Sequence, residues 1–399
     1  MPTLRTSQSA MTYNILVLDA GQRSALAVTR SIGKLPNLTI YTADSSTHAL
    51  AGRSAFSHKY LISPNAVEAP EAYISWINTL TREIEFALVL PVTEVTSQLL
   101  LMNEKRLPNV RLAFASYDNV MQIADKGNLV KLAQQLGMPV PKSEWYAYWS
   151  ELDNSLISYP CVIKPCLSKI YTDKGWVSTA VSILHNDADL KKALAKSPYL
   201  HNSPFMIQEF IPGSGAGIFC LFKHGDPVIF FAHNRLREKP PSGGVSVLSE
   251  SVLPNPDLQN QAKRLLSEAN WHGVAMIEFR IAEDGTAYLM EVNTRFWGSL
   301  QLSIDAGVDF PALMVSNELG LGIKPPITYK VGQRLRWFLG DLDSLYIYLK
   351  SNYSKRQKIT RCLQFCIPDF LNTRHEINRF NDLKPALFEL KQYVKQLLR

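Results

Sequence analysis

The segment from Gly273 to Phe310 constrains the chain most strongly, because it combines two short apolar runs with a tight turn and a group of polar side chains. The turn falls at Asp284-Gly285. Each apolar run is short and bounded by polar residues, which predicts two buried strands of a hairpin rather than a helix. Glu278 lies near the end of the first strand, and the second ends in EVNTR, residues 291–295.

The polar residues of this hairpin predict a metal site. Side chains alternate along a strand, so Glu291 and Asn293 point to the same face, and Glu278 is expected beside them. Oxygen ligands of this kind suit a Mg²⁺ ion that also holds substrate phosphates. Arg295 follows on that face, and its guanidinium suits a phosphate or a carboxylate. A structural cluster of ion pairs is the alternative interpretation.

Composition limits the class of protein. With 399 residues, 46% hydrophobic and 19% charged, the chain is long enough for two or three globular domains and is not expected to be disordered. No apolar run has the length of a membrane span, and the first ten residues lack the apolar core of a signal peptide. Five cysteines without zinc-type spacing favour reduced thiols in a cytoplasmic protein.

The net charge of +7 is concentrated at one end. Residues 326–399 contain 14 Lys and Arg against 6 Asp and Glu, whereas residues 1–325 contain 28 against 29. A general nucleic-acid-binding surface is therefore not expected.

The last residues predict an amphipathic helix. Over Lys384–Leu398, apolar side chains recur with helical spacing at Leu387, Leu390, Val394 and Leu397-Leu398. We expect this helix to pack on the rest of the protein or on a second copy of the chain, as in a homodimer. Contact of the basic tail with an anionic membrane surface is the less favoured alternative.

The N-terminal part has a strand–turn–helix–strand pattern over residues 14–44, which predicts a βαβ-like start without the dinucleotide motif G-x-G-x-x-G. A further strand is expected over Val110–Ala115. In open α/β sheets, ligands bind beyond the carboxyl ends of the strands. Arg53, Thr93 and Glu94 are therefore candidates for a substrate site, with ordinary capping and surface charge as the favoured alternative.

Two lysines in the middle of the chain stand in unusual places. Lys126 begins a predicted helix, where a cation opposes the helix dipole and indicates an anionic partner. Lys164 ends an apolar strand just before Pro165, which blocks further ladder pairing, so its side chain is expected to face a cleft. Each lysine taken alone is more often an ordinary solvated one.

The order of these residues along the chain resembles that of the ATP-grasp superfamily. The resemblance extends from about Asp125 to Pro311 and is most specific in EVNTRFWGSLQLSIDAGVDFP, residues 291–311. Within the superfamily, the chain is most similar to the carbamoyl-phosphate-synthase-like and carboxylate–amine ligase branches.

The resemblance implies an α/β and α+β fold. A Rossmann-like pre-ATP-grasp domain would be followed by a two-lobed ATP-grasp fold and a mostly helical C-terminal extension. The expected segments are a tail at 1–12, the Rossmann-like domain at 13–116, the ATP-grasp domain at 117–325 with its smaller lobe at about 140–210, and the basic extension at 326–399.

The resemblance also implies how the chain would hold ATP. Lys126 and Lys164 match the two lysines that bind the nucleotide phosphates. Residues 209–211 match the hinge that binds adenine: Glu209, Phe210 and Ile211.

The remaining matched residues would serve the metal and the reaction. The Mg²⁺ ligands, with Mn²⁺ as an alternative ion, would be Glu278, Glu291 and Asn293. Arg295 matches the arginine that holds the transferring phosphoryl group. Arg235 or Arg237 would steady the same charge or a carboxylate substrate.

The chemistry implied is ATP-dependent ligation of a small-molecule carboxylate to an amine, through an acyl phosphate and with release of ADP and phosphate. Carbamoyl-phosphate or carboxylase chemistry on bicarbonate is one alternative. A non-catalytic nucleotide-binding or membrane-associated scaffold is another.

Two departures from the family pattern stand out. The loop CLSKIYTDKGW after Lys164 lacks a glycine-rich phosphate lid, and Ser168 or Lys169 is the candidate substitute. The loop at residues 213–217 lacks the acid expected to bind the ribose.

Overall fold

The computed structural model describes residues 12–153, 157–173, 175–241, 243–366 and 372–398. Of the tail expected at residues 1–12, residues 1–11 lie outside this described part. Within it, no helix combines the length and the apolar character that a membrane crossing requires.

The N-terminal part is a four-stranded parallel sheet with strand order β3-β2-β1-β4. The strands are β1 (Tyr13–Val17), β2 (Leu38–Asp44), β3 (Lys59–Ile62) and β4 (Leu88–Leu90). The helices are α1 (Arg23–Ile32), α2 (Pro70–Glu83) and α3 (Glu94–Met102).

Successive side chains of the central strand β1 enter different hydrophobic clusters. Ile15 and Val17 pack in the cluster that contains α1, and Leu16 packs in the cluster that contains α2. Helices therefore cover both faces of the sheet, which explains its continuous apolar strands. The strand predicted over Val110–Ala115 is reduced to a single bridge from Leu112 to Val89.

The smaller lobe follows two short helices, α4 (Tyr117–Ala124) and α5 (Lys126–Gln135). Its sheet has the order β5-β10-β6-β9. These strands are β5 (Ser143–Tyr146), β6 (Cys161–Pro165), β9 (Ser182–Leu184) and β10 (Phe205–Glu209), and the sheet packs on α6 (Asp187–Lys196). A separate hairpin of β7 (Lys169–Thr172) and β8 (Gly175–Ser178) replaces the loop expected after Lys164.

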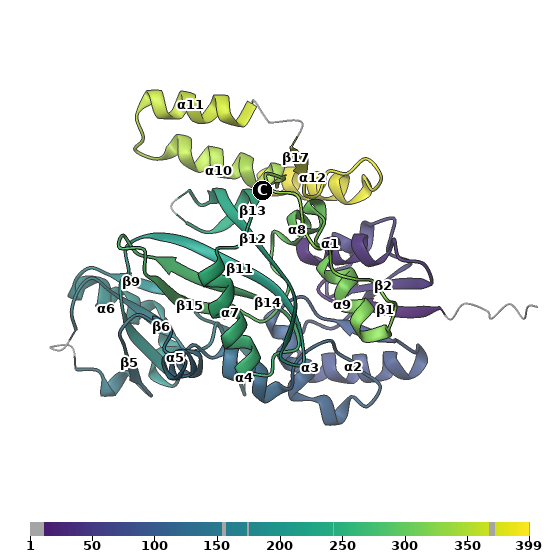
Figure 1. Ribbon diagram of the computed structural model, residues 1–399, viewed down its shortest axis with the longest axis horizontal. Coiled ribbons are helices and arrows are strands. Elements are labelled where there is room, and N and C mark those ends of the chain that lie inside the picture. The colour runs from purple at the N-terminus through teal and green to yellow at the C-terminus, as the bar shows by residue number, and fades with distance from the viewer. Residues whose placement is uncertain (1–11, 154–156, 174, 242, 367–371, 399) are drawn as a thin grey trace, which may run out of the picture.

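A seven-stranded sheet with order β15-β14-β11-β12-β13-β16-β17 lies between these two parts (Figure 1). Its first strands are β11 (Ser214–Lys223), β12 (Asp226–Lys239), β13 (Val245–Val252), β14 (Gly273–Ile281) and β15 (Ala287–Asn293). The helix α7 (Pro256–Glu268) packs on one face, against Ile218, Cys220 and Phe222. On the other face, α8 (Leu300–Ala306) and α9 (Phe310–Leu319) share a cluster with Phe219 and Leu221.

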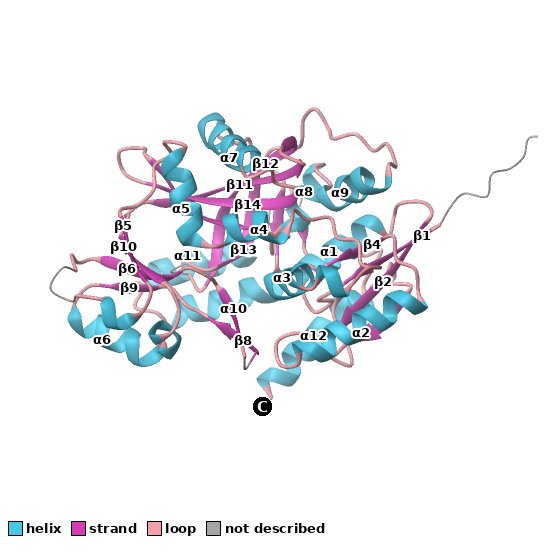
Figure 2. Ribbon diagram, turned by 90° about the horizontal axis from the view of Figure 1, so that it is seen from below, coloured by secondary structure: helices cyan, strands magenta, loops and turns pink. Residues whose placement is uncertain are grey.

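The C-terminal extension continues this sheet and adds helices to it. Its strands are β16 (Arg334–Arg336) and β17 (Thr373–His375), and its helices are α10 (Phe338–Lys350), α11 (Lys355–Cys366) and α12 (Lys384–Leu397). Figure 1 shows α10 and α11 side by side above β12 and β13, and Figure 2 shows the smaller lobe and the N-terminal sheet on opposite sides of the molecule. Short 3-10 helices occur at Ala51–Arg53, Glu104–Arg106, Trp149–Glu151 and Pro198–His201.

The terminal helix α12 forms where it was predicted, but its apolar stripe does not pack on this chain. Leu387 and Leu390 are 66% and 50% exposed, and Leu397 is 70% exposed. The helix is held instead by Phe388, which packs on the core, and by Glu389, whose carboxylate accepts a 2.7 Å hydrogen bond from Trp337 Nε1. The stripe therefore does not pack on the described part of this chain, and packing on a second copy of the chain stays a prediction.

The elements together confirm the predicted class, a parallel α/β part followed by an α+β part and a helical extension. All five cysteines are unpaired.

Candidate functional site

The four polar residues of the hairpin come together as predicted. Glu278 and Glu291 are direct partners in the β14–β15 register, and Asn293 lies opposite Met276. Asn293 Nδ2 donates a 3.1 Å hydrogen bond to Glu278 Oε1, and an Arg295 guanidinium nitrogen donates one of 3.3 Å to Asn293 Oδ1. One small surface therefore carries two carboxylates, an amide and a guanidinium.

The facing carboxylates of Glu278 and Glu291 are stabilised in their ionised form by nearby positive charge. Burial, followed by the negative charge of Glu291, raises the pKa of Glu278, and Arg235 opposes this rise. Arg235, from β12, donates to Glu278 Oε2 at 3.0 Å and to Glu238 Oε1 at 3.3 Å. Arg235 therefore lies at the hairpin, as predicted.

The donor set fits a magnesium ion. No group of three or more His, Cys, Asp or Glu side chains with metal-binding geometry occurs among the described residues. Two facing carboxylates and an amide oxygen form a smaller set, which suits Mg²⁺ because that ion usually keeps several waters and takes substrate phosphates as further ligands. The residues that would hold it are Glu278, Glu291 and Asn293.

Both predicted lysines reach the hairpin, Lys126 from α5 and Lys164 from the smaller lobe. Lys164, in β6, is 4% exposed, and its Nζ donates a 2.7 Å hydrogen bond to the Met290 carbonyl. Burial lowers the pKa of Lys164 to about 8, although the charge of Glu291 opposes this shift. Lys126, at the start of α5, donates to Ser168 Oγ at 2.8 Å and lies 3.7 Å from Glu291 Oε2.

The predicted hinge lies at the end of β10. Glu209 is exposed, and its carboxylate accepts a 3.3 Å hydrogen bond from the Lys142 amide. Phe210 is half-buried and Ile211 is buried. The Ile211 carbonyl accepts a 3.2 Å hydrogen bond from Arg280 Nε, so this backbone acceptor already has a partner.

Arg237 is the predicted site residue that the structure places away from the hairpin. Its guanidinium is bidentate to the buried carboxylate of Asp341, with Nε 2.8 Å from Oδ1 and a terminal nitrogen 2.5 Å from Oδ2. The β12–β13 register shifts on both sides of Arg237, which directs its side chain differently from that of Arg235. Of the two arginines, only Arg235 contacts the predicted metal ligands.

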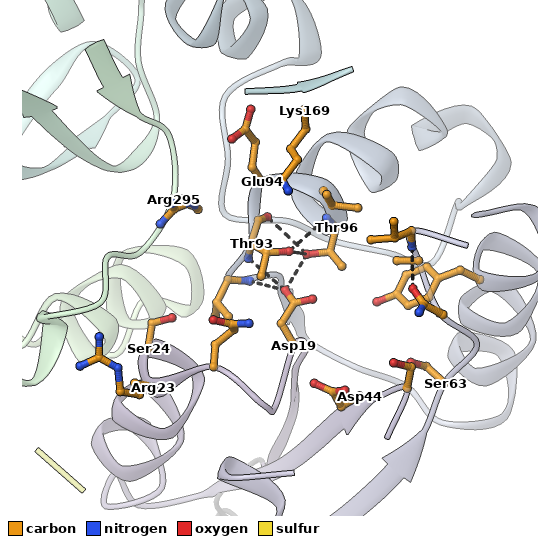
Figure 3. A pocket seen from close by; sticks show the side chains of 18 of the residues that line it. Asp19, Arg23, Ser24, Asp44, Ser63, Thr93, Glu94, Thr96, Lys169 and Arg295 are labelled. Carbon is orange, nitrogen blue, oxygen red and sulfur yellow. Dashed lines mark hydrogen bonds between the residues drawn. The ribbon is translucent and has the colours of Figure 1, made fainter. Parts of the chain in front are cut away.

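A cavity of about 560 Å³ lies next to the hairpin, beyond the carboxyl ends of β1, β2 and β4 (Figure 3). Asp19 lies in its wall and accepts hydrogen bonds from the Val92 amide at 3.0 Å, the Thr93 amide at 3.0 Å and Thr96 Oγ1 at 2.6 Å. Burial raises the pKa of Asp19, and these hydrogen bonds oppose the rise. The location agrees with the rule that ligands bind at this edge of an open α/β sheet.

Glu94 and Arg295 connect this cavity with the hairpin. They line both the large cavity and a small recess that also contains Lys126, Ser168, Glu291 and Asn293. Burial raises the pKa of Glu94, and the nearby charges of Lys126 and Arg295 oppose this rise. In Figure 3, Glu94 and Lys169 lie side by side, and Arg295 lies across from them.

Of the three candidate substrate-site residues from the N-terminal part, Thr93 and Glu94 line the cavity and Arg53 does not. Thr93 caps α3, its hydroxyl accepting from the Thr96 amide, and it also lines the cavity with Glu94. Arg53 does not line it, because its guanidinium lies 5.8 Å from the centre of the Phe388 ring on α12.

Sequence reasoning missed Asp19, which carries much of the hydrogen bonding in the cavity wall. The signal was present, since an acid follows an apolar strand directly. Asp44, at the end of β2, accepts hydrogen bonds from the Gly21 amide at 2.7 Å and the Ser46 amide at 3.2 Å. It also lines the cavity.

A family model supports the resemblance seen in the sequence. Residues 201–339 match a family described as ATP-grasp in the biosynthetic pathway with Ter operon. No curated protein sequence matches the chain.

Solved structures extend the comparison over most of the chain. An L-amino acid ligase from Bacillus licheniformis superposes with a TM-score of 0.60 at 18% identity, covering 79% of this chain and 78% of that one. A biotin carboxylase from Campylobacter jejuni gives 0.61 at 16% identity, covering 80% and 74%. The fold is an ATP-grasp fold.

A third structure with this fold is an N5-carboxyaminoimidazole synthetase from Staphylococcus aureus complexed with ADP, with a TM-score of 0.60, 12% identity and 81% of each chain covered. These ATP-grasp neighbours span both the amino-acid ligase type and the carboxylase type. They share the fold that the resemblance in the sequence predicted.

Proposed function

We propose that this ATP-grasp chain is an ATP- and Mg²⁺-dependent ligase that joins a small carboxylate to an amine and releases ADP and phosphate. The observation that carries the proposal is the convergence of Lys126 and Lys164 on Glu291, directly opposite Glu278. Lys126 Nζ lies 3.7 Å from Glu291 Oε2, and Lys164 bonds the carbonyl just before Glu291. Such a set of cations and metal ligands suits the phosphates of a nucleotide.

Each side chain has a task in this proposal. The two lysines hold the phosphates, and Arg295 faces the transferring group from the other side of the recess. Arg235 opposes the rise in the pKa of Glu278. Glu278, Glu291 and Asn293 would hold a Mg²⁺ ion, which would supply positive charge against the charge that develops on the phosphates.

The large cavity is the proposed place of the carboxylate and the amine. Arg295 lines both the cavity and the recess, so a carboxylate bound to its guanidinium lies next to the proposed phosphate site. Attack of this carboxylate on the γ-phosphate forms an acyl phosphate and ADP. The amine then attacks the acyl carbon and displaces phosphate, losing its proton.

Asp19, Asp44 and Glu94 are the acids in the cavity wall that could receive a substrate amine. The L-amino acid ligase with the same fold is a precedent for an amino acid in one of these roles. We propose that the amine of the substrate binds near Glu94, where a carboxylate and the reacting end of the cavity are closest to each other.

An ADP-release screen of amino acids and small carboxylates, supplied in pairs, tests the proposal. ADP and phosphate are expected only when both a carboxylate and an amine are present with Mg²⁺. Release of AMP and pyrophosphate would contradict the acyl-phosphate route. ADP formation that requires bicarbonate and no organic acid would identify carboxylase-type chemistry instead, and ATP binding without turnover across the panel would favour a scaffold.

A further inference from the structure

A second cavity, of about 420 Å³, lies between β12 and the helices α10 and α11 of the C-terminal extension. It is separate from the large cavity at the N-terminal sheet, with which it shares no lining residue. Its wall carries four arginines and a single acid. The lining residues with charge are Arg235, Arg237, Arg356, Arg361 and Glu238.

Two of the lining arginines, Arg237 and Arg361, belong to a buried cluster with more positive than negative charge. Asp341 is fully buried and binds three guanidiniums, those of Arg237, Arg336 and Arg361. One carboxylate cannot neutralise three cations, so two positive charges remain uncompensated within this cluster. Buried charges of this kind are costly unless they are paired.

Two arginines have unused hydrogen-bonding capacity toward the cavity. Arg361 is 6% exposed, and its second terminal nitrogen has no hydrogen-bond partner among the described residues, although the first donates to Asp341 at 2.7 Å. Arg356, one turn earlier on α11, lies at the exposed rim and makes no ion pair within the described part of the chain. Arg356 can therefore donate to a molecule in the cavity, and Arg361 brings to the same wall a buried guanidinium nitrogen without a partner in the described part of the chain.

From this arrangement we infer that the cavity is a binding site for a small anionic molecule bearing carboxylate or phosphate groups. Guanidiniums are planar forks that bind both groups with paired hydrogen bonds. Gln357, Thr360 and Gln364 add neutral polar groups to the same wall, and Tyr348 adds an aromatic surface. The inference rests on the cavity and its charges and is independent of the proposed ligase reaction.

The position of the cavity links it to the hairpin. Arg235 lines the cavity and also bonds Glu278, one of the proposed metal ligands. An anion in the cavity would therefore compete with Glu278 for the same guanidinium.

Calorimetric titration of the full chain with inorganic phosphate and with citrate tests the site. The buffer is a chloride buffer of constant ionic strength without nucleotide or Mg²⁺. Saturable binding in the millimolar range or tighter is expected for at least one of the two probes. The probe that binds identifies phosphate or carboxylate as the preferred group. The absence of saturable binding for both would overturn the inference.

Variants on α11 locate the binding. Arg356→Gln removes a rim guanidinium and is expected to weaken binding about tenfold, as loss of a charge-assisted hydrogen bond should. Thr360→Glu places a negative charge in the wall and is expected to abolish binding. Lys355→Gln is the matched control, because Lys355 is exposed on the same helix and does not line the cavity. Equal weakening by R356Q and K355Q, or unchanged binding in R356Q, would place the anion elsewhere and overturn the inference.

Discussion

Glu278 and Glu291 face each other as direct partners across β14 and β15, and the amide of Asn293 bonds Glu278. Burial raises the pKa of Glu278, and repulsion from the facing carboxylate of Glu291 raises it further. A divalent cation held by Glu278, Glu291 and Asn293 would remove this repulsion. The pairing therefore favours a metal role over a structural ion-pair cluster.

Glu291→Gln should abolish turnover without unfolding the chain. The substitution keeps the shape of the side chain but removes one charged metal ligand and the partner of Lys126. We expect a loss in kcat of roughly 100-fold or more, as for other groups that stabilise a charged transition state. The Mg²⁺-dependent part of ATP binding, measured by calorimetry, should also decrease.

Glu283→Gln provides the control for this variant, because Glu283 is exposed in the turn of the same hairpin. It should leave turnover and Mg²⁺-dependent ATP binding unchanged. Full activity in E291Q would refute the metal role of Glu291.

Lys164 should take up a proton when a nucleotide binds near pH 8. Its pKa is lowered to about 8 by burial, so about half of the free protein carries a neutral lysine at that pH. An anionic phosphate beside the ammonium raises this pKa again, and proton uptake follows. Calorimetry of ATP binding in two buffers with different ionisation enthalpies measures the uptake, expected to be about half a proton per nucleotide.

Lys164→Arg serves as the comparison, because a guanidinium stays protonated at pH 8. Proton uptake on ATP binding should vanish in K164R, while some affinity for the nucleotide remains. If uptake persists in this variant, another group titrates and Lys164 does not contact the phosphates.

Asp341→Asn should destabilise the fold strongly. The substitution removes the one carboxylate that binds Arg237, Arg336 and Arg361, and leaves buried guanidiniums without a counter-charge. Breaking a buried ion pair from one side costs about 3–5 kcal/mol, and we expect a decrease in the free energy of unfolding of that size. Urea unfolding followed by circular dichroism measures it.

A neighbouring acid offers the matched comparison. Asp343 is 28% exposed and pairs with Lys239 and with Tyr393. Asp343→Asn should cost only about 1 kcal/mol, because solvent screens an exposed pair. Equal decreases in the free energy of unfolding of the two variants would show that burial of the Asp341 cluster does not increase its contribution to stability.

The hairpin site could be predicted because its signals are local. Strand alternation and the turn at Asp284-Gly285 place Glu278, Glu291 and Asn293 together without knowledge of the rest of the fold. Ion pairs between residues that are far apart in the sequence leave no such local signal. Arg237 binds Asp341, which is 104 residues away, and nothing in its local sequence separates it from Arg235.

The position of Lys164 could be predicted from the local sequence only in part. An apolar strand predicts that Lys164 is buried, but only the assembled lobes bring it to the Met290 carbonyl, 126 residues further along the chain. The resemblance to the superfamily supplied this tertiary information. The resemblance does not extend to α12. Helical periodicity alone identifies an apolar stripe on this helix but does not determine which face meets the core.

The orientation of α12 leads to the last prediction, a contrast between two of its apolar side chains. Phe388 packs on the core and lies under the Arg53 guanidinium, whereas Leu390 is 50% exposed. Phe388→Ala should lower the free energy of unfolding by about 1–2 kcal/mol, because part of an aromatic surface is lost from the core. Leu390→Ala should change it by no more than about 0.5 kcal/mol, as is usual for exposed positions. Urea unfolding at low protein concentration compares the two, and a larger loss for L390A than for F388A would show that the apolar stripe is covered, by a second copy of the chain or by another face of the same one.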